Sequence, residues 1–187
     1  MSSTRIHTIG HSRHSAEQFV DLLRGCRVAR LIDIRRIPFS RRNPQFNRER
    51  LAGDLARHQI GYRHMEDLGG KREPADDAGG SPNTGWRNPF LRSYADYART
   101  RPFRAALDAV CRAAEEESCA IMCAEADWRQ CHRQIVADYL LARGLEVVHI
   151  LPGGTVEPAV LTPSASIGPD GTLHYAKATK QQLALDL

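Results

Sequence analysis

The chain has 187 residues and a formal net charge of +4, and 42% of its residues are hydrophobic. This length suits one domain with a full core, and no apolar run approaches the length of a membrane span. The N-terminus lacks the apolar segment of a signal peptide, so we expect a cytoplasmic protein with no membrane partner.

Apolar runs and helical spacings alternate along the chain. Strands are expected at residues 5–9, 28–34, 60–65, 118–123 and 146–151. Helices are expected after a capping box at Ser15 and over residues 47–58, 93–98 and 102–117. A last helix is expected from the helical spacing of Ile135, Val136, Tyr139 and Leu140, and it should stop at Gly144. Residues 68–90 are rich in Gly, Pro, Asp and Asn and should form a loop. The alternation predicts an α/β fold with a mainly parallel sheet of about five strands and helices on both faces.

The composition changes after Pro152-Gly-Gly154, where Pro, Ser, Thr and Gly become frequent. Residues 166–175 contain a Pro-Asp-Gly turn between two apolar ends and predict a hairpin. We therefore expect an α/β domain over residues 1–154 and a C-terminal extension over residues 155–187.

Reactive side chains follow several of the predicted strands. Because the carboxyl ends of parallel strands meet at one edge of a sheet, these side chains should converge on one crevice. The expected reactive cluster is His11, Ser12, Asp33, Glu125, Cys123, Cys131 and His132.

Basic residues concentrate in residues 35–50, which hold six arginines against one carboxylate and thus account for the basic balance of the chain. With Phe39 and Phe46 interleaved, this segment suits a phosphate backbone with stackable bases, although a solvated surface loop is the alternative. The expected phosphate or nucleic-acid ligands are Arg35, Arg36, Arg41, Arg42, Arg72, Arg129 and Arg133.

Of the five cysteines, which show no regular disulfide framework, Cys131 is better placed for chemistry than Cys123. It lies at the start of a predicted helix beside Arg129 and Arg133, where a thiol ionises easily. His132 or His11 would then move a proton, with Glu125 orienting it. The structural alternative is that Cys131 caps the helix and His132 binds a loop carbonyl.

The spacing of cysteine and histidine matches no standard zinc motif. Cys123, Cys131 and either His11 or His132 share a divalent metal only if their loop folds back. We therefore predict no cofactor and no metal site, with a divalent metal as the lesser alternative.

Several motifs together resemble the domain-of-unknown-function 488 family over residues 5–150. They are Thr8-Ile-Gly-His-Ser12, Leu31-Ile-Asp-Ile-Arg35, Pro38 with Ser40-Arg41, Tyr62, Leu68-Gly-Gly70, Tyr94-Ala-Asp-Tyr97, Cys123-Ala-Glu125 and Cys131-His-Arg133. This resemblance implies an α/β fold and a shared site but no reaction. A looser resemblance links Cys123 and Arg129 to the loop of rhodaneses and cysteine phosphatases, yet the intervening carboxylates would repel an anion.

The final six residues, Gln182-Leu-Ala-Leu-Asp-Leu187, resemble the peptide by which bacterial replication and repair proteins bind the DNA-polymerase sliding clamp. Its anchors would be Gln182, Leu183, Leu185 and Leu187. The alternative is a terminal segment that packs on its own domain.

These features predict a DNA-associated protein, and more specifically an enzyme acting on nucleic acid or a nucleotide in bacterial repair or replication. A cysteine-dependent transferase or phosphatase for a small anion is one alternative. A non-catalytic DNA-binding or clamp-recruited adaptor is another.

Overall fold

Six strands form one sheet in the order β3-β2-β4-β1-β5-β6 in the computed structural model of the chain, which describes residues 4–73 and 80–177. The first five strands of this order are parallel, and β6 runs antiparallel to β5. The strands are β1 (Arg5–Gly10), β2 (Arg30–Asp33), β3 (Gly61–His64), β4 (Cys119–Cys123), β5 (Glu146–Ile150) and β6 (Val156–Pro158). The predicted α/β fold with a mainly parallel sheet is therefore confirmed.

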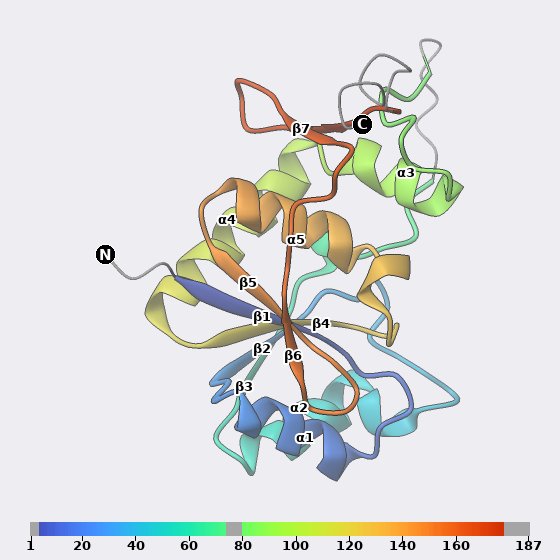
Figure 1. Cartoon of the computed structure of the whole chain (residues 1–187). Coiled ribbons are helices and arrows are strands. Elements are labelled where there is room, and N and C mark those ends of the chain that lie inside the picture. The colour runs from blue at the N-terminus through green and yellow to red at the C-terminus, as the bar shows by residue number, and fades with distance from the viewer. Residues whose placement is uncertain (1–3, 74–79, 178–187) are drawn as a thin grey trace.

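Helices cover both faces of the sheet, as expected (Figure 1). The helices α1 (Ala16–Gly25) and α2 (Arg48–Ala56) lie on one face. The other face carries α3 (Pro89–Tyr97), α4 (Arg101–Glu116) and α5 (Arg133–Ala142). Each face has its own apolar core, because successive side chains of a strand point to opposite faces.

The alternation along β4 decides where its last residue points. Ala120 and Met122 belong to the core under α1 and α2, whereas Ile121 and Cys123 belong to the core under α3, α4 and α5. Cys123 therefore ends the strand on the face that carries α5, the helix that begins just after Cys131.

The helices of the described residues differ in how their starts are capped. Ser15 forms the predicted capping box, in which its side chain accepts from the Gln18 N–H and the Gln18 side chain accepts from the Ser15 N–H. Asn47 precedes α2, but its side chain accepts from the Ser40 N–H instead of capping the helix. The helix α3 begins at Pro89, four residues before the predicted start, because Asn88 caps it and proline suits its first turn.

The segment after residue 154 shares the core of the α/β fold. Val156–Pro158 forms β6, a strand that the sequence pattern did not predict. The predicted hairpin is present as β7 (Ala165–Ile167) and β8 (Leu173–Tyr175). Leu173 and Tyr175 are fully buried in the core under α5, and the Tyr175 hydroxyl donates to Asp138 at 2.9 Å.

Residues 182–187, which carry the expected clamp-binding peptide, lie outside the described residues. No helix within residues 4–73 and 80–177 has the length and apolar character needed to cross a membrane.

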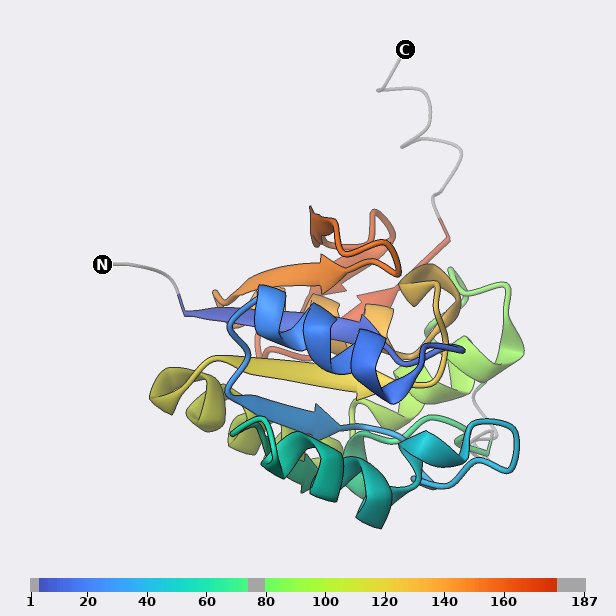
Figure 2. The ribbon, with the colours of Figure 1, turned by 90° about the horizontal axis from the view of Figure 1, so that it is seen from below.

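The connections that leave the neighbouring strands β1 and β4 run toward opposite edges of the sheet. The chain leaving β1 passes through α1 toward β2, while the chain leaving β4 passes through α5, on the other face, toward β5. The carboxyl ends of the parallel strands point to the same side, as the arrowheads in Figure 2 show. Ligands of open α/β sheets bind in the crevice at such a reversal, so the edge beside β1 and β4 is the first place to look for a site.

Candidate functional site

A cleft of about 1080 Å³ opens at this edge of the sheet. Its wall comes from the segments that follow β1, β2, β3 and β4, together with the start of α3. The loops after β1 and β4 are tied to each other, because the His11 and Ser12 N–H groups donate to the carbonyls of Cys123 and Ala124. Of the predicted reactive residues, the cleft wall contains His11, Ser12, Cys123, Glu125, Cys131 and His132.

Cys123 and Cys131 contact each other in the cleft wall, with their sulfur atoms 2.8 Å apart. Both thiols are free, and their residues are only 1% and 3% exposed. Cys123 is held by the end of β4, and Cys131 precedes α5, whose first N–H, that of Arg133, donates to the Cys131 sulfur at 3.5 Å. The fold thus brings the two cysteines of the predicted cluster into one pair.

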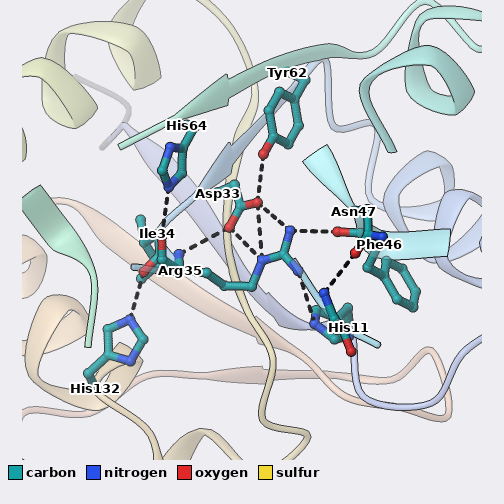
Figure 3. Close-up of polar contacts among 10 residues, drawn as sticks. His11, Asp33, Ile34, Arg35, Phe46, Asn47, Tyr62, His64 and His132 are labelled. Atoms are coloured by element: carbon teal, nitrogen blue, oxygen red, sulfur yellow. Dashed lines mark hydrogen bonds and ion pairs between the residues drawn. The ribbon is translucent and has the colours of Figure 1, made fainter. Parts of the chain in front are cut away.

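His132 also contacts the Cys131 sulfur. Its Nδ1 lies 3.5 Å from the Cys131 sulfur, and its Nε2 lies 3.0 Å from the Ile34 carbonyl oxygen (Figure 3). Because a carbonyl only accepts, Nε2 carries a proton and donates to Ile34, which leaves Nδ1 to face the sulfur. The Tyr94 ring packs against His132 with centroids 5.0 Å apart and fixes its plane.

The pKa values of the two thiols are shifted in opposite directions. Burial and the hydrogen bond to Cys131 raise the pKa of Cys123 well above its usual value. Burial also opposes ionisation of Cys131, but the hydrogen bond from Cys123 and the charges of His132 and Arg133 outweigh it and lower its pKa. Burial works against the charged form of His132 as well, yet the Cys131 thiolate raises the pKa of His132. The favoured state is therefore a Cys131 thiolate beside a His132 imidazolium, with Cys123 protonated.

His11 occupies a different position from the one expected of a proton shuttle. Its Nδ1 bonds the Ser12 carbonyl at 3.0 Å, Arg35 lies 3.4 Å from its Nε2, and its ring stacks on Phe46. Burial and the Arg35 charge lower the pKa of His11 to about 4. His11 is thus a neutral, fixed group near pH 7, whereas His132 is the histidine that contacts a thiol.

Asp33 and Arg35 form a buried ion pair, and Arg35 is also part of the cleft wall (Figure 3). The Arg35 guanidinium binds both Asp33 carboxylate oxygens, and its Nη2 also donates to the Phe46 carbonyl at 2.7 Å. The Tyr62 hydroxyl donates to Asp33, and burial, together with the charge and hydrogen bond of Asp33, raises the pKa of Tyr62. Asp33 therefore holds Arg35 and the 34–47 loop in place, which differs from the expected role of a reactive group.

Two glycines allow the elements of the site to come this close. A Cβ at Gly10 would lie 1.8 Å from the Glu125 carbonyl oxygen, so only glycine lets β1 pass under the loop after β4. A Cβ at Gly70 would lie 2.8 Å from Nδ1 of His132. The Gly-His-Ser and Leu-Gly-Gly motifs of the sequence thus have packing reasons beside any chemical one.

Arg133 does not take the expected position of a phosphate ligand. It is 1% exposed, and its Nη2 donates to the Glu125 and Ala126 carbonyls at 2.7 and 3.2 Å. Its charge stabilises the nearby thiolate while its hydrogen bonds fix the 123–131 loop. Glu125 is likewise held through its main-chain carbonyl, in place of the expected contact with a histidine.

The other predicted phosphate ligands divide into two sets. Arg36 and Arg42 are exposed and belong to the cleft wall, together with Arg13 and Lys71. Arg41, Arg72 and Arg129 are not part of that wall. Arg72 instead binds the Gly69 and Glu66 carbonyls and stacks on Tyr97, and Arg129 pairs with Glu157 and stacks on Trp128.

Within the part of the chain that the structure describes, no group of three or more His, Cys, Asp or Glu side chains could hold a metal ion.

Several residues that lie in the cleft wall or contact the predicted site were missed as site residues in the sequence. Tyr94 and Tyr62 were part of the family resemblance, but nothing in their spacing indicated that Tyr94 reaches His132 or that Tyr62 reaches Asp33. Lys71 and Phe90 lie in or beside the aperiodic 68–90 segment, whose composition indicated only a loop. Their nearest signal was the Gly-Gly-Lys sequence after the third strand.

Comparison with known proteins gives one result. A family model described as "Domain of unknown function DUF488" matches residues 15–140, which is more than half of the chain. The match includes Cys123, Cys131 and His132 but begins after His11. No curated protein and no solved structure matches the chain.

Proposed function

The chain belongs to the DUF488 family, whose description names no activity, and from its cleft we propose that it is an enzyme acting on nucleic acid or a nucleotide. One observation carries this proposal: the paired Cys131 and His132 lie in the same cleft wall as an excess of exposed cationic side chains. A reactive thiolate and a phosphate-binding surface thus face the same volume.

The charge of the wall favours a phosphate-bearing ligand. Arg13, Arg36, Arg42 and Lys71 contribute four positive charges, against the single carboxylate of Glu125. Arg35 also belongs to the wall, but its charge is neutralised by Asp33. A surface of this kind attracts phosphates and releases counterions when it binds them.

Aromatic side chains in the wall favour a ligand that also carries bases. Phe39 is 60% exposed and Phe90 is 68% exposed, although both belong to the cleft wall. Covering these rings with a ligand would remove apolar surface from water, which is favourable. Stacking of a base on an aromatic ring contributes roughly 1–3 kcal/mol and needs no sequence preference.

The chemistry we propose uses Cys131 as nucleophile and His132 as proton donor. A thiolate attacks an electrophilic carbon or phosphorus of the bound ligand, and the adjacent imidazolium protonates the leaving group. Arg133, whose charge lowers the pKa of Cys131, keeps the sulfur ionised before the ligand arrives. Cys123, with its raised pKa, stays protonated beside it.

The alternative of cysteine-dependent transfer on a small anion shares the same thiolate. It is supported by the N–H of Arg133, at the start of α5, which donates to the Cys131 sulfur. A volume of about 1080 Å³ is larger than a phosphate or sulfur anion needs, which favours the nucleotide.

A non-catalytic adaptor would bind nucleic acid equally well when Cys131 is replaced.

A binding experiment with matched arginines tests the ligand class. Fluorescence anisotropy of a labelled single-stranded oligonucleotide is followed as salt increases, for wild type, Arg42→Ala and Arg41→Ala. Because Arg42 belongs to the cleft wall and Arg41 does not, Arg42→Ala should reduce the log–log salt slope by about 0.7 and Arg41→Ala should change it less. Phe90→Ala should weaken binding, whereas Val160→Ala, an exposed apolar control, should not. Absence of binding at low salt contradicts the proposal.

An activity screen tests the reaction. Nuclease, glycosylase and phosphatase substrates are assayed with and without a divalent metal. Any activity found should be lost in Cys131→Ser and kept in Cys26→Ser, a thiol remote from the cleft wall. Activity that survives Cys131→Ser would contradict the proposed nucleophile.

Bacterial DNA repair or replication, in the cytoplasm, is the setting we propose, and it rests on the resemblance of residues 182–187 to a clamp-binding peptide. Deleting these six residues should abolish binding to a bacterial sliding clamp and leave the thermal midpoint of the fold nearly unchanged, since a clamp-binding peptide relies on a few anchoring side chains that contact the partner. A lower midpoint with no clamp binding by the full chain would favour packing on the domain.

A further inference from the structure

The contact between the two sulfur atoms has a use that the proposed reaction does not require. Cys123 and Cys131 lie 2.8 Å apart in the wall of an open cleft, and a disulfide needs them at about 2.05 Å. Cys123 ends β4 and Cys131 lies just before α5, so the two sulfur atoms are already in contact when the thiols are reduced.

The other three cysteines lie apart from this pair. Cys119, at the start of β4, is four residues from Cys123 along an extended strand, which separates the two by about 13 Å. Cys26 and Cys111 lie in or beside α1 and α4, away from the cleft wall. Among the five cysteines, the structure therefore pairs two and leaves three apart.

The chemical roles within the pair are unequal. Cys131 has the imidazole of His132 on one side and the first N–H of α5 on the other, both of which stabilise a thiolate. Cys123 accepts neither contact and donates its proton toward Cys131 or the Glu125 carbonyl. Both residues line the cleft, so an oxidant that reacts with the Cys131 thiolate leaves the oxidised sulfur in contact with the Cys123 thiol.

We propose that Cys123 and Cys131 are an oxidation site for hydroperoxides, in which Cys131 is the attacking thiolate and Cys123 the resolving thiol of a reversible intramolecular disulfide. Cys131, although only 3% exposed, lies in the wall of a cleft that is large enough for hydrogen peroxide. Disulfide formation stands independently of the proposed function, although its consequence, loss of the nucleophile, rests on that function.

The reaction balances in two steps. In the first, the Cys131 thiolate attacks a peroxide oxygen: an S–O bond forms, the O–O bond breaks, and the departing hydroxide takes the proton of the His132 imidazolium to give water. In the second, the Cys123 sulfur attacks the sulfenic sulfur of Cys131: an S–S bond forms, the S–O bond breaks, and the hydroxide leaves with the Cys123 proton as a second water. Two thiols lose two electrons, and one peroxide gains them.

The site then changes in a defined way. The thiolate of Cys131 disappears, so Arg133 and His132 lose the negative charge that they face. A dithiol reductant restores both thiols by exchange. In this way, the cleft keeps its phosphate-binding wall but loses its nucleophile until it is reduced.

Peptide mass spectrometry of the full, reduced chain tests the proposal. After treatment with one equivalent of hydrogen peroxide, the number of alkylatable cysteines should fall from five to three, and a cross-linked pair of peptides should contain Cys123 and Cys131. Dithiothreitol should restore all five. The wild-type measurement needs no variant, so it holds even if a substitution impairs folding.

Variants separate the two roles. Cys123→Ser should accumulate a Cys131 sulfenic acid that dimedone traps, whereas Cys131→Ser should be oxidised at neither position. Cys26→Ser and Cys111→Ser are matched controls and should form the 123–131 disulfide as wild type does. The proposal is overturned if wild type gives sulfenic or sulfinic acid at Cys131 without the cross-link, if the disulfides join separate chains, or if both thiols stay unoxidised. Loss of the cross-link proposal would leave the DNA-binding and activity tests unaffected.

Discussion

Cys131 is buried, and burial alone would keep its thiol neutral. Three contacts reverse that tendency: the hydrogen bond from Cys123, the imidazole of His132, and the positive charge of Arg133. His132 is oriented from behind by its bond to the Ile34 carbonyl, so the loop after β2 controls the tautomer that faces the sulfur. The reactivity of one atom thus depends on the ends of β2, β4 and α5.

The first prediction concerns this pairing. In His132→Asn, the Cys131 thiolate loses its cationic partner, so alkylation of Cys131 by iodoacetamide at pH 7 should slow by about tenfold for each unit by which its pKa rises. His58→Asn, a change at an exposed histidine of the same type, should leave the rate unchanged. Rates are read by mass spectrometry of the Cys131 peptide. Equal rates in wild type and His132→Asn would contradict the ion pair.

The second prediction concerns His11, whose pKa is lowered to about 4 in the folded chain from 6.5. Since the unfolded chain takes up a proton below pH 6.5 and the folded chain does not until about pH 4, the stability that neutral His11 supports is complete above 6.5 and is lost between the two values. The free energy of unfolding should fall by roughly 3 kcal/mol across this window through His11 alone.

Urea unfolding at a series of pH values measures this slope. In His11→Asn the fall should be smaller, although not absent, because burial also lowers the pKa of His149 to about 4. His58→Asn again serves as the matched control. A slope unchanged in His11→Asn would show that His11 is not the neutral, buried group described here.

At the scale of elements, the site depends on how closely β1 passes the loop after β4. The loops are joined by N–H bonds from His11 and Ser12 to the carbonyls of Cys123 and Ala124, and the Arg133 guanidinium fixes the same loop from the side of α5. These bonds place Cys131 against Cys123. A small displacement of the β4 loop would therefore separate the two sulfur atoms.

The third prediction tests that dependence. Gly10→Ala places a Cβ 1.8 Å from the Glu125 carbonyl oxygen, so the loop after β4 must move. We expect lower stability by more than 2 kcal/mol and slower alkylation of Cys131, because overpacking of a close contact typically costs 1–3 kcal/mol or more. Gly53→Ala, within α2 and with open space around it, should instead stabilise the chain by about 0.5–1 kcal/mol.

Chemical denaturation of the two variants measures their stability, and alkylation kinetics measure the reactivity of Cys131. If Gly10→Ala is as stable and as reactive as wild type, the close passage of β1 under the β4 loop is not what holds the cysteine pair.

At the scale of the whole molecule, periodicity was sufficient to predict the five parallel strands and the helices between them, since long apolar patterns are encoded locally. The strand β6 escaped prediction because its three residues carry no pattern, and only pairing with β5 makes them a strand. The convergence of Cys123, Cys131 and His132 followed from parallel topology. Their individual contacts did not, because these depend on rotamers and on Tyr94 and Gly70 from distant segments.

The arginines show most clearly what the sequence alone could not predict. In the sequence Arg133 and Arg42 look equally suited to phosphate, yet Arg133 is buried beneath a loop and Arg42 is exposed in the cleft wall. Burial is set by tertiary packing, and no local pattern distinguishes the two. Asp33 was likewise read as reactive because it ends a strand, whereas its carboxylate is bound by Arg35 and Tyr62.

The central claim is that the Cys131 thiolate and the phosphate-binding wall share one cleft, and protection from alkylation tests it most directly. A single-stranded oligonucleotide that occupies the cleft should slow alkylation of Cys131 while leaving Cys26 and Cys111, which lie outside the cleft wall, unaffected in the same sample. Added salt should remove the protection, and Arg42→Ala should weaken it more than Arg41→Ala. An oligonucleotide that binds the chain but leaves the alkylation rate of Cys131 unchanged would contradict the account.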